Sequence, residues 1–469
     1  MTDPMFGGRR WVLMAIATLA LVGATATQRS ETCSLTRTGP NQNLVNVSCS
    51  CNQRLTQTRL RLYKVAHLSI NQTGCSNRRL ELRWPDLEIR VAPETLVLHN
   101  SHVLFAEHQP NTVWNSSITK LSFVDSSFDF LPAHAFGGMK LLEEIRFLGG
   151  TIGEIRSNAF SGLQRLKVIE IANTTVKNIE SRAFTDLPSL EDLTIVRSKV
   201  DNVESEAVFL PRQDNDEVRR CTNIGRFSSS RSHDFLRDIM ARQLSSTVNL
   251  PLPGYGSRFL LLNNTIQTLN TRAVTSETFG FLIVGGNHIE NVHTRAFSME
   301  LYNECEISAP LFIGNTITNL GSSALAGLKG REGISYQTVI ALSNNVFLSV
   351  AQEGFLLDKS MGVFSIGENK FHCACDKFDW ILSNANSQNQ QELEREMLLG
   401  ARCLDGTELI SFTLTCIDHG ASTTMLPTSP ARPTIRPTVL QPSSAQAHAA
   451  SLASVTASVL TLILCRTFM

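Results

Sequence analysis

Two consecutive blocks of 24 residues, Leu142–Arg165 and Leu166–Ser189, share one pattern of apolar positions and constrain the fold most strongly. They read LEEIRFLGGTIGEIRSNAFSGLQR and LKVIEIANTTVKNIESRAFTDLPS. Each block begins with apolar residues at every second position, as at Ile145 and Phe147, which is the spacing of a strand. Self-similarity at such a period is typical of a solenoid, in which each turn buries its apolar face against its neighbours. The chain is therefore predicted to grow by stacking turns.

The repeated pattern resembles extracellular leucine-rich repeats of the form LxLxxNxIxxIxxxAFxxLxx. The second apolar position of this frame recurs at Leu87, Val103, Phe128, Ile152, Val176, Val200, Ile266, Ile289, Ile317, Phe347 and Phe371. The N slot, whose asparagine bonds the backbone inside the turn in this family, holds Ser126, Gly150, Thr174 and Ser198, and then Asn264, Asn287, Asn315, Asn345 and Asn369. The resemblance implies an α/β repeat fold, mostly β: a leucine-rich-repeat solenoid with disulfide caps and an irregular convex side. The architecture is similar to that of cell-surface proteins such as connectin, chaoptin and the Nogo receptor.

Composition and the repeat frame divide the chain into successive segments. We assign 1–26 to a signal peptide, 27–78 to an N-terminal cysteine cap, 79–200 to leucine-rich repeats, 201–256 to an irregular insertion, 257–371 to leucine-rich repeats, 372–418 to a C-terminal cysteine cap, 419–444 to a Pro/Ser/Thr-rich stalk and 445–469 to a glycolipid (GPI) anchor signal. Proline, glycine and serine break the frame within the insertion. Ile224 nevertheless keeps the 24-residue step from Val200, so we expect one degenerate turn there.

The N-terminal residues have the features of a secretory signal peptide. Arg9 and Arg10 precede an apolar run, Trp11–Val22, and Ala24–Ala26 supplies small residues for cleavage. The alternative is a membrane anchor, but the run is short for a span. Eleven cysteines fit an oxidising compartment, in which most cysteines are paired. Five N-x-[ST] sequons predict glycosylation on the same route, at Asn46, Asn71, Asn115, Asn173 and Asn263.

Cysteines cluster at both ends of the repeats, where a solenoid exposes an apolar cross-section and needs a cap. The cluster before the repeats resembles the N-terminal cap of the family, with an unrelated disulfide knot as the alternative; it comprises Cys33, Cys49, Cys51 and Cys75. The stretch FHCACDKFDW, followed by Cys403 and Cys416, resembles the C-terminal cap. The resemblance implies that Cys373 pairs with Cys403 and that Cys375 pairs with Cys416. No metal site is expected, because an oxidising compartment favours disulfides over zinc.

Two further cysteines lie in irregular segments. Cys221 is in the insertion and Cys305 is in the second block of repeats. Whether they pair stays open, because several turns separate them and a disulfide needs Cα atoms within about 7 Å.

The C-terminal residues favour a glycolipid anchor. Ser443, Ser444 and Ala445 form a small-residue triplet with attachment at Ser443, and a short spacer and the apolar tail Leu452–Leu464 follow. A single spanning helix is the alternative, although it needs about 20 apolar residues and a basic flank. We therefore expect the protein on the extracellular side of the plasma membrane, with single-pass or secreted forms as alternatives.

The outward positions of the first strand differ between the two blocks of repeats. Because side chains alternate across a strand, these positions can be read from the frame. The first block has Ser122, Arg146, Glu170 and Thr194 there, whereas the second has Leu260, Ile283, Leu311 and Ala341. The second block therefore offers a candidate binding face of Leu260, Leu262, Phe281, Ile283, Leu311 and Ile313. The alternative is that the insertion folds over these residues and buries them.

The sequence favours recognition over catalysis. It contains no G-x-S-x-G, H-E-x-x-H, P-loop or G-x-G-x-x-G motif, and no cofactor is expected. Lys plus Arg equals Asp plus Glu at 42 each, so the basic excess of a nucleic-acid-binding protein is missing. We predict a non-enzymatic cell-surface protein that binds a protein ligand or a second copy of itself through the concave face. A secreted matrix protein is the first alternative, and a β-helix enzyme that acts on polysaccharides is the second.

Overall fold

The computed structural model describes residues 33–39, 44–50, 67–73, 80–83, 93–106, 117–211, 257–277, 279–301, 309–330, 338–351, 353–355, 362–375, 400–409, 411–412 and 415–416. The chain forms two compact units. Unit 1 comprises Met1–Lys177 with Asp186–Ser189, and unit 2 comprises Asn178–Thr185 with Leu190–Met469. The boundary runs through strand β10 (Thr175–Ile179).

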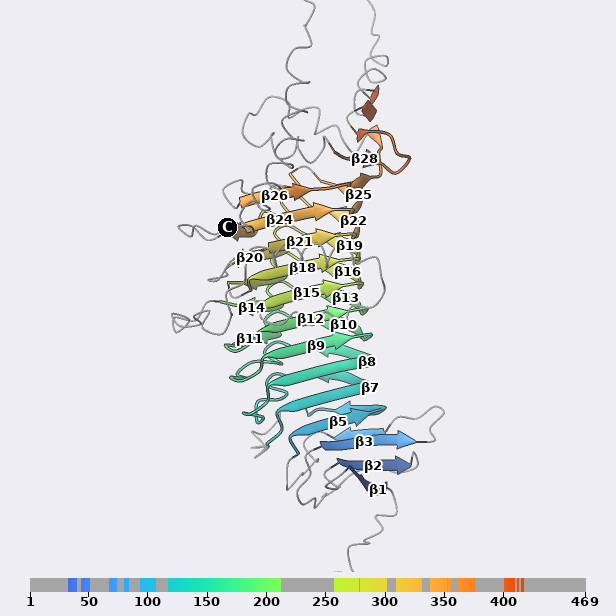
Figure 1. The fold of residues 1–469 in the computed structure, drawn as a ribbon, viewed down its shortest axis with the longest axis vertical. Helices are drawn as coiled ribbons and strands as arrows, with labels where there is room; N and C mark the ends of the chain where they lie inside the picture. Colours follow the sequence, from blue (N-terminus) through green and yellow to red (C-terminus); the bar gives the residue numbers. More distant parts are fainter. Residues whose placement is uncertain are drawn as a thin grey trace, which may run out of the picture. The chain divides into compact units, whose positions relative to one another are not determined.

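Unit 1 is a stack of strands that are nearly all parallel (Figure 1). Its strands are β1 (Cys33–Thr38), β2 (Leu44–Ser50), β3 (His67–Thr73), β4 (Leu80–Arg83), β5 (Thr95–His99), β6 (Ser101–Leu104), β7 (Lys120–Leu131), β8 (Glu144–Ile155) and β9 (Val168–Ala172). Strand β1 is antiparallel to β2, and β2, β3, β5, β7, β8 and β9 then follow in parallel order. The N-terminal end of the stack is therefore closed by a hairpin-like pair instead of a further coil.

The two repeated blocks have the predicted strand alternation. Ile145, Phe147, Ile169 and Ile171 are buried, while the residues between them reach the surface. Behind the strands, phenylalanine rings of successive turns stack, as between Phe123 and Phe147 at 5.2 Å. Burial of such rings against the neighbouring turn is the main driving force for stacking.

Gly150 shows why the N slot departs from asparagine in this block. Its φ is +87°, and a Cβ there would lie 1.8 Å from the carbonyl oxygen of Ser126. Only glycine fits this close approach of two backbones.

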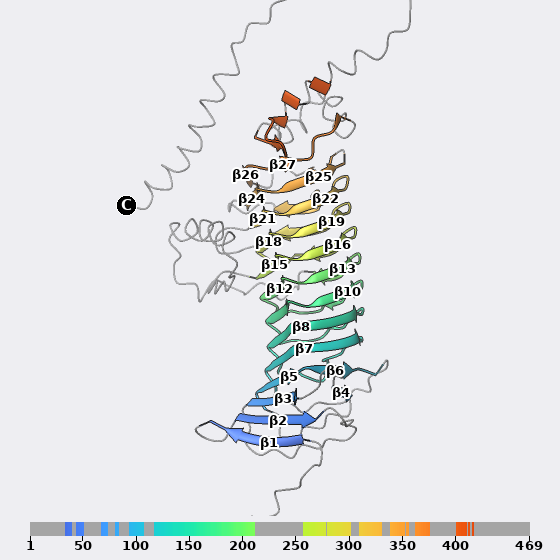
Figure 2. The same cartoon turned by 90° about the vertical axis from the view of Figure 1, so that its right-hand side faces the viewer.

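Unit 2 is a three-sided coil, each side made of parallel strands. The first side stacks β12 (Asp192–Val196), β15 (Arg258–Leu262), β18 (Phe281–Gly285), β21 (Ala309–Ile313), β24 (Thr338–Ser343) and β26 (Gly362–Ile366). Figure 1 shows these strands one above the other. The second side stacks β13 (Lys199–Val203), β16 (Thr265–Leu269), β19 (His288–Val292), β22 (Thr316–Leu320), β25 (Val346–Val350), β27 (Lys370–Phe371) and β28 (Arg402–Cys403). Figure 2 shows this side from β13 to β27. In the two units together, ten of the residues predicted at the second apolar position of the repeat, from Val103 to Phe371, are buried at 5% exposure or less.

The third side of unit 2 is a further parallel sheet of five strands. It stacks β11 (Phe184–Thr185), β14 (Val208–Leu210), β17 (Val274–Ser276), β20 (Phe297–Leu301) and β23 (Leu328–Gly330). The sequence predicted an irregular return segment here. The strands are only two to five residues long, so they carry too little alternation to be read from periodicity. The predicted mostly-β solenoid is confirmed, with more regular structure on this side than expected.

The described strands on either side of the insertion pair directly with each other in unit 2. Strand β12 pairs directly with β15, as in Thr194 opposite Leu260, and β14 pairs directly with β17. The degenerate turn predicted at Ile224 lies outside the described residues. The direct pairings leave no place in the stack for a coil between β12 and β15. Residues 201–210 were assigned to the insertion from the sequence. In the structure 201–203 belong to β13 and 208–210 form β14, so this stretch completes the preceding coil.

Asparagines of the N slot form a continuous buried ladder in unit 2. Each side chain donates to a carbonyl of the preceding coil, as Asn315 Nδ2 does to Val284 O at 2.8 Å. Each Oδ1 accepts the backbone N–H of the slot residue one coil earlier, as Asn315 Oδ1 does from Asn287 at 3.0 Å. The ladder runs through Ser198, Asn264, Asn287, Asn315, Asn345 and Asn369, all at 3% exposure or less. The slot thus satisfies backbone groups that the turn would otherwise leave buried without partners.

Candidate recognition surfaces

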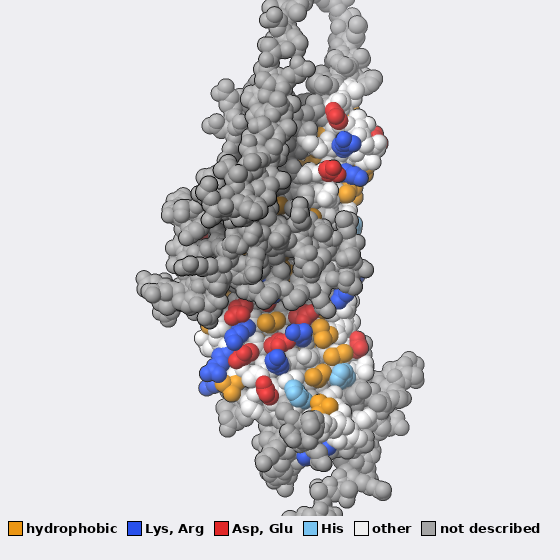
Figure 3. All heavy atoms as spheres, viewed as in Figure 1, with side chains coloured by type: hydrophobic (Ala, Val, Ile, Leu, Met, Phe, Trp, Pro, Cys, Tyr) orange, Lys and Arg blue, Asp and Glu red, His pale blue; other side chains and the backbone are white. Residues whose placement is uncertain are grey.

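The outward side chains of β7, β8 and β9 form an exposed surface in unit 1. We call this surface the unit 1 sheet face; it comprises Lys120, Ser122, Val124, Glu144, Arg146, Leu148, Val168 and Glu170. All eight are half-exposed or exposed. Figure 3 shows charged side chains mixed with hydrophobic ones over these strands.

Charges of opposite sign alternate across the unit 1 sheet face because the parallel register places them side by side. Glu144 lies opposite Lys120, and Arg146 lies opposite Glu170. Lys120 Nζ is 3.5 Å from Glu144 Oε2, and Arg146 Nη1 is 3.2 Å from Glu170 Oε2. Arg146 also pairs with Glu144 through Nε. The side chain of Arg146 remains 42% exposed, so its guanidinium is accessible to a partner.

A row of uncharged side chains borders this network. His99 in β5, Val124 in β7 and Leu148 in β8 are neighbours in the parallel register and are half-exposed. Burial lowers the pKa of His99 below its usual value, and the charge of Asp125 partly opposes this effect. The lowered pKa favours the neutral form of His99, and the row presents a mainly apolar strip beside a charged network.

The corresponding face of unit 2 is buried. We call it the unit 2 sheet face: it comprises Leu260, Leu262, Phe281, Ile283, Leu311 and Ile313, which are 0–6% exposed. Strand β18 is buried along its whole length, on both of its faces. These residues were the candidate binding face in the sequence, and in the structure they are not exposed contact surface. The alternative attributes such burial to the insertion, of which residues 212–256 lie outside the described residues.

The sequon asparagines occupy different environments. Asn173 and Asn263 are exposed residues with positive φ; Asn173 directly follows β9 and Asn263 directly follows β15. Asn46 lies within β2, half-buried and flanked by β1 and β3. Asn71 belongs to β3, and Asn115 lies outside the described residues.

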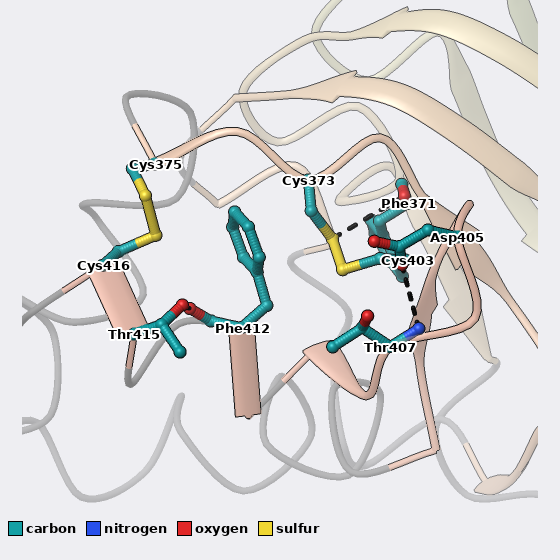
Figure 4. The surroundings of a disulfide bond; sticks show 9 residues. All are labelled: Phe371, Cys373, Cys375, Cys403, Asp405, Thr407, Phe412, Thr415 and Cys416. Atoms are coloured by element: carbon teal, nitrogen blue, oxygen red, sulfur yellow. Dashed lines mark hydrogen bonds between the residues drawn. A yellow bond between two sulfur atoms is a disulfide. The ribbon is translucent and has the colours of Figure 1, made fainter.

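Two disulfides stabilise the end of unit 2 (Figure 4). Cys373 is joined to Cys403 and Cys375 to Cys416, with Cα–Cα distances of 5.5 Å in both. This is the pairing that the family resemblance implies. Strand β28, which carries Cys403, pairs with β27 and so covers the last coil.

Several positions singled out in the sequence lie outside the described residues. They are Cys51, Cys75, Cys221, Cys305, the signal peptide, the stalk and the attachment residue Ser443. Cys33 and Cys49 lie opposite each other in the register of β1 and β2. Among the residues that the structure describes, no helix has the length and apolar character needed to cross a membrane.

One side-chain group in unit 1 has the composition of a catalytic triad. His102 Nδ1 lies 2.9 Å from Ser127 Oγ, and His102 Nε2 lies 3.6 Å from Asp129 Oδ2. Ser127 is only 7% exposed, and Asp129 projects into solvent at 68% exposure of its side chain. A nucleophile must be able to reach a carbonyl, and the Ser127 hydroxyl is too buried to do so. The histidine must also be held by a hydrogen bond from the third group, and Asp129 at 3.6 Å is too far from His102 for one. Within the described ranges, no group of three or more His, Cys, Asp or Glu side chains is placed to hold a metal ion.

Comparison with known proteins supports the repeat fold. Residues 109–212 match the family described as BspA type leucine rich repeat region, in six copies. No curated protein matches significantly. Among solved structures, a chain of the octameric complex of Latrophilin 3 (Lec, Olf), Unc5D (Ig, Ig2, TSP1) and FLRT2 (LRR) is similar at 17% identity, over 75% of this chain and 87% of that chain, with a TM-score of 0.26. A TM-score this low gives no support for a shared function.

Proposed function

We propose that this chain is a non-enzymatic recognition protein of the cell surface that binds a protein ligand through the unit 1 sheet face. The observation that carries the proposal is the contrast between the two sheet faces. The unit 1 sheet face is accessible and combines an apolar strip with accessible charges, whereas the unit 2 sheet face is buried. Protein interfaces combine an apolar core with a polar rim, and the unit 1 sheet face offers both.

The charged part of the face is suited to specificity more than to affinity. Surface ion pairs contribute about 0–1 kcal/mol to stability. In the Arg146–Glu170 pair both side chains keep solvent contact, at 42% and 25% exposure, so a partner can exchange this pair for contacts of its own at little cost. Complementary charge on a ligand would steer its approach and reject wrong partners. Val124 and Leu148 then supply the area from which water is excluded.

Reversal of the charge at Arg146 tests this surface. The full chain, displayed on cells, is screened against a library of tagged ectodomains, and each ligand found is retested on Arg146→Glu. The variant places a third carboxylate beside Glu144 and Glu170, so we expect binding to weaken by more than about 1 kcal/mol, or about fivefold.

Arg165→Glu is the matched control, because Arg165 is exposed in the turn before β9 and outside the sheet face. It should bind as the unchanged chain does. Equal loss in both variants, or no loss in Arg146→Glu, would place the contact elsewhere.

The anchoring proposal concerns the C-terminal residues and is independent of the ligand. We propose a glycolipid anchor attached at Ser443, on the basis of the small-residue triplet and the apolar tail. Treatment of intact cells with a phosphatidylinositol-specific phospholipase C should release the protein into the medium. Retention after complete enzyme action would favour a spanning helix, and release without the enzyme would favour a secreted protein.

A further inference from the structure

We propose that Asn173 in unit 1 and Asn263 in unit 2 carry N-linked glycans. Each residue lies at the corner that directly follows a strand of its own unit, where a glycan points into solvent. This inference concerns modification and holds whether or not the unit 1 sheet face binds a ligand.

The corner is the residue directly after β9 in unit 1 and directly after β15 in unit 2. Asn173 follows β9 and Asn263 follows β15, with φ values of 53° and 54°. Asparagine tolerates this left-handed conformation better than most residues. Both side chains are exposed, so a glycan on the amide nitrogen needs no change in the coil.

The middle residue of each sequon is buried and hydrogen-bonded inside the coil. Thr174 Oγ1 donates to Ala172 O at 2.9 Å, and Asn264 Nδ2 donates to Ile195 O at 2.8 Å. Because the middle residue points inward, the asparagine before it and the threonine after it both reach the surface. Thr175 is half-exposed and Thr265 is exposed. The two residues that define a sequon are therefore both accessible at these corners.

The environment of Asn46 is different. Its strand, β2, is hydrogen-bonded on one side to β1 and on the other to β3. Asn46 lies opposite Thr36 and Ser69 in the register and is half-buried. A glycan there would have to lie across neighbouring strands, so the corner sites are the ones that the fold accommodates freely.

Asn344 provides a natural comparison within unit 2. It is exposed, has a φ of 56°, and precedes the ladder residue Asn345, as Asn263 precedes Asn264. Its third residue is Val346, half-exposed at the start of β25, where the other corners have threonine. Asn344 thus has the corner geometry without the hydroxyl that a sequon requires.

A glycan on Asn173 would affect access to unit 1. Asn173 directly follows Ala172, the last residue of β9, and Glu170 lies two residues before the end of that strand. A bulky, soluble group would therefore stand at the end of the strand. A protein ligand of the unit 1 sheet face would have to approach from the opposite ends of the strands.

The test is glycopeptide mass spectrometry on the full chain made in a eukaryotic secretory host, with and without peptide N-glycosidase F. We expect glycans at Asn173 and Asn263. Thr175→Ala and Thr265→Ala should each abolish the glycan at its own site, and Thr175→Ser and Thr265→Ser should retain it. Val346→Thr should add a glycan at Asn344, and the protein should be secreted with an unchanged melting temperature.

Occupancy is read from total cell extract as well as from medium, so a variant that is retained in the cell still gives a result. Unmodified Asn173 and Asn263 in the unchanged chain would overturn the proposal. A Val346→Thr protein that is glycosylated but fails to fold would show that the corner does not accommodate a glycan, which would also overturn it.

Discussion

Replacing Asn315 with alanine is expected to lower the free energy of unfolding of unit 2 by about 3–6 kcal/mol. The Asn315 side chain is fully buried and bonds the coils on both sides of it. It contacts Val284 O at 2.8 Å and the N–H of Asn287 at 3.0 Å in the preceding coil, and Asn345 Oδ1 at 3.0 Å in the following coil. Each buried polar group that loses its partner costs about 1–3 kcal/mol, and the substitution also breaks the bonds to the side chains of Asn287 and Asn345. Chemical denaturation of the secreted protein measures the change, and reduced secretion is the expected result in cells.

Asn319→Ala is the matched control, since Asn319 lies on the same coil but is exposed. Its side chain donates one hydrogen bond, to Asn291 Oδ1 at 2.9 Å. A surface substitution of this kind usually changes stability by less than about 0.5 kcal/mol. Equal effects of the two substitutions would show that the buried ladder does not hold the coils together.

Ile283→Asp is expected to destabilise unit 2 by about 3–5 kcal/mol, because it leaves an unpaired charge in a buried position. Ile283 is 1% exposed and lies between Leu260 and Leu311 in the register of the first side. We expect Leu311→Asp, at a position that is 0% exposed, to behave in the same way. Melting temperature and yield in the medium are the measurements.

Gln267→Asp introduces the same side chain at an exposed position of β16 and should leave melting unchanged. Normal secretion and melting of Ile283→Asp and Leu311→Asp would mean that the unit 2 sheet face is accessible in solution. Loss of ligand binding by those well-folded variants would then identify it as the contact surface, in place of the unit 1 sheet face.

Much of the coil could be predicted because its determinants are local. Alternation at Ile145 and Phe147 specifies which side of the strand is buried, since successive side chains point to opposite faces. Repetition at a fixed period then specifies the neighbours of each strand, as in Arg146 opposite Glu170. The structural role of the N-slot asparagine came from the resemblance to leucine-rich repeats, and the buried ladder through Asn287 and Asn315 agrees with it.

The sequence did not determine the third side of unit 2 or the path of the stack past the insertion. Strands such as β11 and β17 are too short to show a period. They form because the backbone N–H and C=O groups on this side of each coil need partners, and the same side of the next coil supplies them. The 24-residue step to Ile224 predicted a coil, but the stack has no place for one between β12 and β15. Pairing of β12 with β15 buries Leu193 and Phe259 in successive coils without interruption, whereas a coil at Ile224 would put charged residues into the core.

Exposure of the sheet faces was also decided only by the tertiary structure. The sequence placed Leu260, Ile283 and Leu311 on the outward side of their strands, and the register agrees. An outward position is open to solvent only if no other part of the chain packs on it, and that depends on residues far away in the sequence. The sequence therefore determined the coil and the direction of each side chain, while tertiary packing decided which of the two sheet faces a partner can reach.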